Sequence, residues 1–393
     1  MTNPVSQFLQ ERIDANDFPS AVYLVAEKGE IVFRDALGFA VVEPERIPAT
    51  IDTIYDLASL TKPLVTGLLA AVLIENGLIR LDDRLATHSG KFYIGEKKLI
   101  TLLNLLTHTS GFCSWLPFYF FTRGKRIPLE QISTIIADML PTYQPNEKVV
   151  YSDLNFLTLQ ELIQHKYRKT IDEIARTVIF EPLRLSDTYF NPPKDLKPRI
   201  AASEKGNEYE KRTCIELGYV EPPAEEGKSD NPPSAFRDEV IWGEVHDGNA
   251  YFMGGIAGHA GLFSTAEEVF RIALQFLPNY TTLLKPETCE LFKTNFTPGM
   301  NEARSVAFQL AQTPGSAAGS HISPQSFGHL GFTGTSLWID PEKERIFILL
   351  TNRTHAHPLP FVNINSVRRR FHDLAGELLD GAGFKNFDSQ NES

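Results

Sequence analysis

The sequence predicts an α+β fold, in which helices flank an antiparallel sheet and an all-helical domain is inserted between its strands. Strand-like patterns occur near both ends of the 393-residue chain, whereas helical patterns dominate the middle. The simplest packing joins both chain ends in one sheet and covers it with the terminal helices. We therefore expect a sheet domain of residues 1–57 and 241–393, a helical domain of residues 58–190, and a proline-rich connecting region over 191–240.

The first elements are a helix and a hairpin. Residues 20–38 alternate as two strands around a turn at Lys28-Gly29, which is typical of a hairpin. Before them, residues 3–16 have the spacing of a helix whose apolar face holds Val5, Phe8, Leu9 and Ile13.

Helical patterns then continue to residue 180, and turn residues follow them. Five helices are predicted, at residues 60–77, 97–107, 129–140, 152–166 and 170–180. The stretch 191–240 contains three Pro-Pro pairs and many polar residues, which is typical of a connection.

The last quarter of the chain returns to strands. A helix over 265–276 follows Ser264, and Glu267 three residues later indicates a capping box. Two strands surround a turn at 341–343, and a closing helix covers about 362–380.

Composition excludes several classes of partner. The net charge of −11 argues against nucleic acid and anionic membranes, both of which need clustered Lys and Arg. The longest apolar run, 64–74, is too short to span a bilayer. Three widely spaced cysteines indicate neither a disulfide framework nor a zinc ribbon. The start lacks the features of a secretory signal, so we expect a cytoplasmic protein, and the oligomeric state stays open.

A serine and a lysine stand at the front of the apolar segment 56–77. On a helix, Ser59 and Lys62 share a face, and Pro63 is tolerated in a first turn. A serine needs a base to become a nucleophile, and burial lowers the pKa of a lysine enough to supply one. The alternative is that Ser59 only caps the helix while Lys62 extends to the surface.

Two further motifs carry candidate functional residues. Tyr151 precedes the helix over 152–166, and Asp153 either caps that helix or contacts Lys62. In the glycine-rich strand 327–339, His329 and the backbone N–H of Phe332 are candidates to line a site. The alternatives are that Tyr151 is a packed aromatic, that Asp153 is a helix cap, and that the glycine-rich stretch is a bend in a strand.

A metal site was also weighed. His246, Asp247 and His259 lie close in sequence, but their spacing matches no metal motif. We expect hydrogen bonding within loops there, and neither a metal nor another cofactor.

Taken together, Ser59-Leu60-Thr61-Lys62, Tyr151-Ser152-Asp153 and His329-Leu330-Gly331 resemble the three ordered motifs of the serine β-lactamase superfamily. The similarity is to class C β-lactamases, low-molecular-weight penicillin-binding proteins and family VIII esterases, and covers about residues 4–380. The resemblance implies a β-lactamase/transpeptidase-like fold.

The resemblance also implies roles for single residues. Ser59 would be the acylated nucleophile, Lys62 its base partner and Tyr151 the general acid and base. The N–H groups of Ser59 and Phe332 would form the oxyanion hole, with His329 and Gly331 beside the substrate. Asp153 stands where class C enzymes usually have Asn. Its carboxylate favours protonated Lys62, which shifts the base role towards Tyr151 and favours phenolate there.

Leu330 is the second departure, because the third motif usually carries threonine there. Leu330 has no hydroxyl to hold a substrate carboxylate, so the sequence favours an esterase or peptidase activity over a β-lactamase activity. We expect a serine hydrolase that forms an acyl-enzyme on Ser59 with small esters, amides or peptides. The alternatives are a penicillin-binding DD-peptidase or β-lactamase, for which no export signal is visible, and an inactive binding protein on the same fold.

Overall fold

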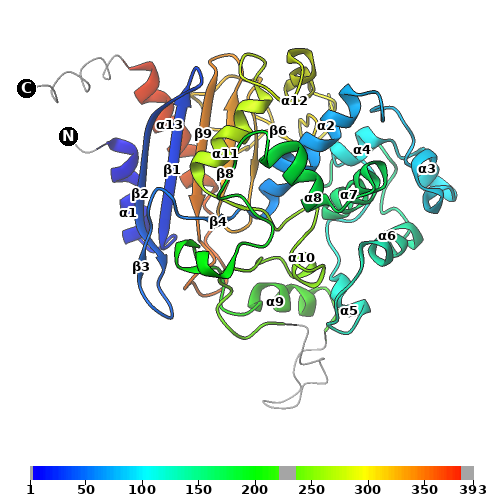
Figure 1. The fold of residues 1–393 in the computed structure, drawn as a ribbon, viewed down its shortest axis with the longest axis horizontal. Helices are drawn as coiled ribbons and strands as arrows, with labels where there is room; N and C mark the ends of the chain where they lie inside the picture. Colours follow the sequence, from blue (N-terminus) through cyan, green and yellow to red (C-terminus); the bar gives the residue numbers. More distant parts are fainter. Residues whose placement is uncertain (1–2, 221–235, 382–393) are drawn as a thin grey trace, which may run out of the picture.

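The computed structural model describes residues 3–220 and 236–381, and its centre is a seven-stranded antiparallel sheet (Figure 1). The strand order is β3-β2-β1-β9-β8-β7-β6. The strands are β1 Ser20–Glu27, β2 Glu30–Val41, β3 Ile47–Pro48, β6 Gln309–Leu310, β7 Phe327–Leu330, β8 Ser336–Asp340 and β9 Arg345–Thr351. Because β1 pairs directly with β9, both chain ends build one sheet, which confirms the predicted fold class.

Each side of the sheet packs against its own apolar cluster. Along β1, Tyr23 and Val25 face the helices α1, Pro4–Asp14, and α13, Asn365–Asp380 (Figure 1). The alternate residue Leu24 joins the large core on the opposite face, where α11, Ala266–Ala273, packs on β1 and β9. Successive side chains of a strand point to opposite faces, so β1 is buried on both sides.

Helices fill the space beside the sheet (Figure 1). They are α2 Leu68–Glu75, α3 Leu85–His88, α4 Leu102–Leu106, α5 Phe118–Phe121, α6 Leu129–Asp138, α7 Asp153–Tyr167 and α8 Ile171–Ala175. The smaller elements near them are α10 Gly248–Phe252, α12 Glu290–Lys293 and a two-stranded sheet of β4 Tyr55–Asp56 with β5 Phe263–Ser264. One continuous core joins these helices to the sheet, and the predicted domain boundaries stay a prediction.

The apolar segment that carries Ser59 is the central helix of this core. It begins with the 3₁₀ turn η1, Ala58–Leu60, continues as the π-helical η2, Lys62–Gly67, and ends as α2. Residues Ala58–Glu75 are long and apolar enough to cross a membrane, but 83% of the stretch is buried inside the protein. Because a buried core helix of a soluble protein passes the same test, the stretch is weak evidence for a membrane span.

Three local predictions were wrong. The region expected to be only a connection contains a 3₁₀ turn, Lys194–Arg199, and the helix α9, Glu208–Glu216, while 221–235 lies outside the described residues. Helix α9 buries Glu210 and Cys214 despite its polar composition. The N-cap of α11 is Thr265, which accepts from the N–H of Glu268, because Ser264 belongs to β5. The closing helix begins at Asn365 instead of 362.

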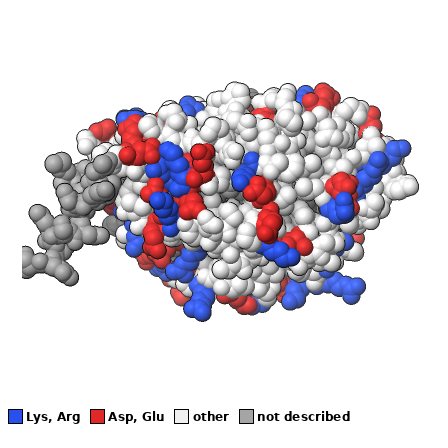
Figure 2. Space-filling view, turned by 90° about the horizontal axis from the view of Figure 1, so that it is seen from above, with Lys and Arg blue, Asp and Glu red and all other residues white. Residues whose placement is uncertain are grey.

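Charged side chains of both signs are mixed on the surface. On the face in Figure 2, blue and red side chains lie next to one another, so its described residues form no continuous basic patch. This agrees with the negative net charge and gives no electrostatic footprint for nucleic acid on that face.

Candidate active site

The backbone before Ser59 is held in a strained conformation. Ala58 has a φ of +47°, a region that side-chain-bearing residues seldom adopt. The N–H of Ala58 donates to Asp56 Oδ1 at 2.8 Å, which stabilises this turn. As a result Ser59 stands partly exposed at the front of an otherwise buried helix.

Lys62 is fully buried, and three neighbours surround its ammonium group. Its Nζ donates to Ser59 Oγ at 2.9 Å and to the carbonyl of His259 at 3.1 Å. The third neighbour is Asp153, whose Oδ1 lies 2.7 Å away. Burial opposes the charge, but the carboxylate of Asp153, helped by Tyr151, raises the pKa of Lys62 above its usual value. Lys62 is therefore an ammonium at neutral pH, hydrogen-bonded to two oxygens and ion-paired with Asp153.

Tyr151 lies between cations and imidazoles. Lys62 Nζ is 4.8 Å from the centre of its ring, and the ring of His108 packs against it at 4.6 Å. Its buried hydroxyl makes no ordinary hydrogen bond to a described residue. Burial raises the pKa of Tyr151, although the nearby Lys62 and Ser59 lower it. Lys62 favours the phenolate as expected, but desolvation is the larger effect, so the pKa of Tyr151 lies above its usual value.

The third motif lies at the end of β7, next to the Ser59 turn. His329 is buried, and its Nδ1 is 2.9 Å from the carbonyl of Leu330. Burial, followed by the charges of Lys62 and Arg304, holds the pKa of His329 well below its usual value, so the ring is neutral. A side chain at Gly331 would place its Cβ 2.6 Å from the carbonyl of Leu57, so only glycine allows this approach.

Two residues with free backbone N–H groups line a shared cavity of about 930 Å³. Ser59 and Phe332 both line it, together with Tyr151, Asp153 and His329. Among the residues that the structure describes, neither the N–H of Ser59 nor that of Phe332 has a hydrogen-bond partner. Free N–H groups beside a hydroxyl nucleophile can stabilise the oxyanion that forms when a carbonyl is attacked.

One wall of the cavity comes from the helix that sequence analysis missed. Tyr209 and Glu210 of α9 line it, and the ring of Tyr209 lies 4.6 Å from that of Phe332. Burial and the charge of Asp247 raise the pKa of Glu210 to about 7. The polar sequence of 191–240 gave no signal of this wall, because its apolar contacts are with residues far away in the sequence, such as Phe332.

Two arginines form another part of the cavity wall. Arg353 donates to the carbonyls of Phe332 and Val362, and Arg368 donates to those of Gly331 and Thr335. Within the described chain, neither arginine has a carboxylate partner.

The basic wall could have been noticed in the sequence. Burial and the nearby Arg353 lower the pKa of Arg368 to about 9. Arg368 lies on the buried face of α13 with His372 and Ala375, and an arginine on such a face is a signal for a site.

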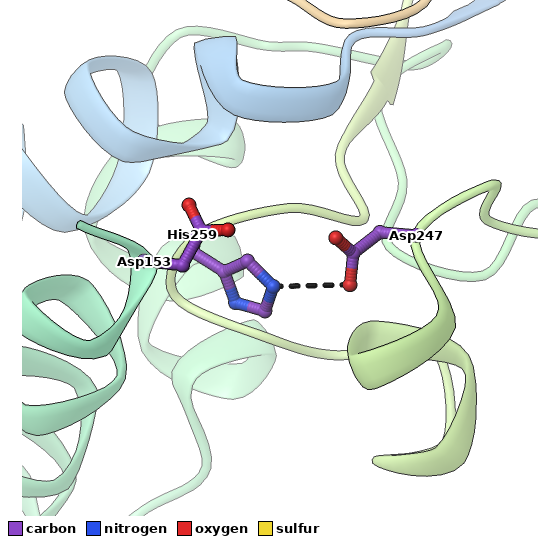
Figure 3. Close-up of side chains that lie close together, drawn as sticks. All are labelled: Asp153, Asp247 and His259. Carbon is purple, nitrogen blue, oxygen red and sulfur yellow. Dashed lines mark hydrogen bonds and ion pairs between the residues drawn. The ribbon is translucent and has the colours of Figure 1, made fainter. Parts of the chain in front are cut away.

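Asp247 and His259, two of the three residues weighed for a metal, do meet in space. Asp247 Oδ1 and His259 Nε2 are 3.0 Å apart, and Asp153 completes a group of possible ligands (Figure 3). His246 instead pairs with Glu204 at 2.8 Å. Because Asp153 already faces the ammonium of Lys62, a second cation there would meet strong repulsion. The donor set therefore fits a buried hydrogen-bond network better than a metal.

The structure brings all seven predicted site residues to one place. Six of them line the cavity, and Lys62 lies buried directly behind Ser59. The residues that line the cavity are Ser59, Tyr151, Asp153, His329, Gly331 and Phe332.

The chain is similar to known proteins over most of its length. A family model described as Beta-lactamase matches residues 5–368. A relative in Escherichia coli (strain K12), named "Putative D-alanyl-D-alanine carboxypeptidase", is 29% identical over 381 residues, covering 90% of this chain and 82% of the relative.

Solved structures share the fold. EstCE1, described as a hydrolase with promiscuous acyltransferase activity, superposes with a TM-score of 0.70 at 18% identity, covering 95% of this chain and 97% of that one. A class C β-lactamase from Rhodobacter sphaeroides gives a TM-score of 0.69 at 18% identity, covering 96% and 100%.

Proposed function

Because the chain belongs to the β-lactamase family of serine hydrolases, we propose that it cleaves small esters or amides through an acyl-enzyme on Ser59. The observation that carries the proposal is the 2.9 Å contact between Lys62 Nζ and Ser59 Oγ, at the wall of a cavity that also presents two free N–H groups. A helix cap or a surface lysine would need no such arrangement.

In the first half of the reaction, Ser59 Oγ attacks the substrate carbonyl and forms a tetrahedral intermediate. The developing oxyanion is bound by the N–H groups of Ser59 and Phe332. Lys62 donates to Ser59 and cannot accept its proton while it is an ammonium. The proton therefore goes to Tyr151 in the minor population of molecules in which the tyrosine is a phenolate.

In the second half, the leaving group departs with the proton returned by Tyr151. Water then attacks the ester carbonyl of acyl-Ser59, and Tyr151 accepts a proton from that water. The second tetrahedral intermediate then collapses, the acid is released, and Tyr151 returns the proton to Ser59 Oγ, which restores the serine hydroxyl. Tyr151 and Lys62 shift each other's pKa, so a change at either residue should alter the pH profile.

A second candidate is hydrolysis of a peptide that carries a free carboxylate, as the name of the E. coli relative suggests. The specific observation in its favour is the pair Arg353 and Arg368, which line the cavity without carboxylate partners. Guanidinium groups bind carboxylates well, so they could replace the hydroxyl that Leu330 lacks.

Three substrates test the proposal. We expect purified protein to hydrolyse a nitrophenyl ester of a short acid with a higher kcat/KM than a chromogenic cephalosporin, because Leu330 offers no hydroxyl to the cephalosporin carboxylate. Leu330→Thr should narrow the difference. Equal values for both substrates would count against the ester preference.

A peptide ending in D-alanyl-D-alanine distinguishes the second candidate. Release of D-alanine, with a KM that rises at least about tenfold in Arg368→Gln through loss of a charged hydrogen bond, would favour the carboxypeptidase. Turnover of no ester and no peptide by folded protein would contradict the proposal of a hydrolase and favour the inactive binding protein.

A further inference from the structure

We propose that Asp56 is a positioning residue that fixes both halves of the oxyanion hole in one arrangement. This inference deepens the proposed function and rests on it, because it concerns how the N–H groups of Ser59 and Phe332 come to face the same cavity. The two residues lie far apart in the chain, so some contact must set their relative position.

Asp56 is a buried residue whose three acceptor atoms are all engaged. Its side chain is only slightly accessible, with a residue exposure of 6%. Oδ1 accepts from the N–H of Ala58 at 2.8 Å, and Oδ2 accepts from the N–H of His246 at 2.8 Å. Its backbone carbonyl accepts from Thr333 Oγ1 at 2.8 Å. One residue thereby touches three separate segments that meet at the cavity.

The contact with Ala58 acts on the Ser59 half. An aspartate that accepts from the N–H two residues later stabilises a tight turn. Here the turn includes Ala58 at a φ of +47°, a strained conformation that persists only where surrounding contacts hold it. If Asp56 lost this bond, Ala58 could relax and rotate the N–H of Ser59 away from the cavity.

The other contacts act on the Phe332 half. Thr333, the residue after Phe332, is fixed by the carbonyl of Asp56. His246, whose N–H is fixed by Oδ2, stacks its ring on Phe332 with centroids 5.3 Å apart and an angle of 24°. Glu204 holds that ring at 2.8 Å. Asp56 therefore contacts the backbone beside Phe332 through Thr333, and supports the ring of Phe332 through His246.

The consequence is that Asp56 influences the transition state more than the bound substrate. Removing one oxyanion donor costs roughly 10²–10³ in kcat. A small rotation of either N–H group should weaken the tetrahedral intermediate and leave the planar substrate carbonyl nearly as well bound. Asp56 touches no substrate atom in this account, so its effect passes entirely through Ser59 and Phe332.

The test uses Asp56→Ala, Asp56→Asn and Thr333→Val, with Thr158→Val as the matched control. Thr158 is buried, and its hydroxyl donates to the carbonyl of Leu154 within α7, away from the cavity. Acylation by a nitrophenyl ester and inhibition by phenylboronic acid, which forms a tetrahedral adduct on serine, are measured for each folded variant.

We expect Asp56→Ala to lower the acylation rate by about 100-fold and Thr333→Val by about tenfold, with KM within about twofold, as for weakened oxyanion donors. Asp56→Asn keeps one acceptor oxygen and should fall between wild type and Asp56→Ala. Boronate affinity should fall in parallel with the rate. Thr158→Val should change neither.

Other results would overturn the inference. Thr333→Val with the rate and boronate affinity of Thr158→Val would show that Asp56 does not set the Phe332 half. A rise in KM with an unchanged acylation rate would assign Asp56 to substrate binding. An unreactive wild type would contradict the proposed function itself, whereas a reactive wild type with unaffected variants would contradict only the inference.

Discussion

At the scale of single residues, the charge of Lys62 is set by Asp153. The carboxylate lies 2.7 Å from Nζ, and together with Tyr151 it outweighs the burial that would otherwise favour the neutral amine. In the proposed mechanism, the residue type at position 153 thus decides which side chain accepts the proton of Ser59. The resemblance to class C enzymes, which usually have asparagine at this position, implied this argument, but the contact with Lys62 had to come from the structure.

Asp153→Asn should move the alkaline limb of the kcat/KM profile to lower pH. Loss of the carboxylate removes the interaction that raises the pKa of Lys62, so the ammonium deprotonates earlier as pH increases. The pH–rate profiles of wild type and the variant should be recorded side by side. Asp82→Asn, at an exposed carboxylate far from the cavity, is the control and should leave the profile unchanged. Superimposable profiles for Asp153→Asn would make it only the first residue of α7.

Tyr151→Phe should lower activity at every pH, by about 10²–10⁴-fold, because the proton carrier is removed. In wild type, kcat/KM should rise between pH 7 and 9, because burial raises the pKa of Tyr151 and only its phenolate accepts a proton. Tyr143→Phe removes another buried hydroxyl without a hydrogen-bond partner among the described residues, outside the cavity, and serves as the control. A fully active Tyr151→Phe would transfer the base role to Lys62.

At the scale of elements, the end of β7 must approach the Ser59 turn closely. Gly331 makes this possible, because a Cβ there would lie 1.9 Å from Thr335 Oγ1 and 2.6 Å from the carbonyl of Leu57. Thr335 also donates to that carbonyl at 3.0 Å, so strand and turn are joined at this point. The third motif is therefore joined to the Ser59 turn by backbone contacts as well as by side chains.

Gly331→Ala should destabilise the protein by about 1–3 kcal/mol, because the added methyl group overpacks a closed interface. It should also lower the acylation rate, since the shift of β7 moves the N–H of Phe332. Thermal unfolding and ester hydrolysis are the measurements. Gly90→Ala, where a Cβ would meet nothing within 4 Å, is the control. An unchanged acylation rate in Gly331→Ala would show that the position of β7 does not affect the reaction.

Elements with a strong local pattern were predictable, and those formed by distant contacts were not. The hairpin around Lys28-Gly29 and the helix α1 follow from alternation and helical spacing, which are local properties. Helix α9 buries little apolar area of its own, and its role as a cavity wall depends on the ring of Phe332 more than a hundred residues later. The site motifs were found from three ordered stretches, whereas Arg353 was not, because its partners are backbone carbonyls that no sequence pattern marks.

At the scale of the whole molecule, buried ionisable groups make the fold sensitive to alkali. Burial raises the pKa of Tyr23 to about 12, and it also raises that of Tyr55. Lys62 has a raised pKa as well, because of Asp153. In each case the folded state holds its proton to higher pH than the unfolded state does.

Stability should therefore be constant up to about pH 10 and then fall. The unfolded chain releases these protons near the ordinary pKa values, about 10 to 10.5, so deprotonation favours unfolding above that range. Thermal unfolding between pH 8 and 11 measures the effect. Tyr55→Phe should be less stable at neutral pH, through loss of its bond to Ser20, but should show a shallower alkaline decline. A Tm that stays constant to pH 11 would contradict this view.

The central claim is that Ser59 alone becomes acylated, and an intact-mass measurement tests it most directly. Wild type, Ser59→Ala and Ser114→Ala are incubated with a fluorophosphonate, which phosphonylates activated serines and releases fluoride. Ser114 lines the same cavity but has no lysine beside it, so it is a matched control. The account predicts one adduct on wild type and on Ser114→Ala, and none on Ser59→Ala. An adduct that persists on folded Ser59→Ala, or its absence from wild type, would contradict the claim.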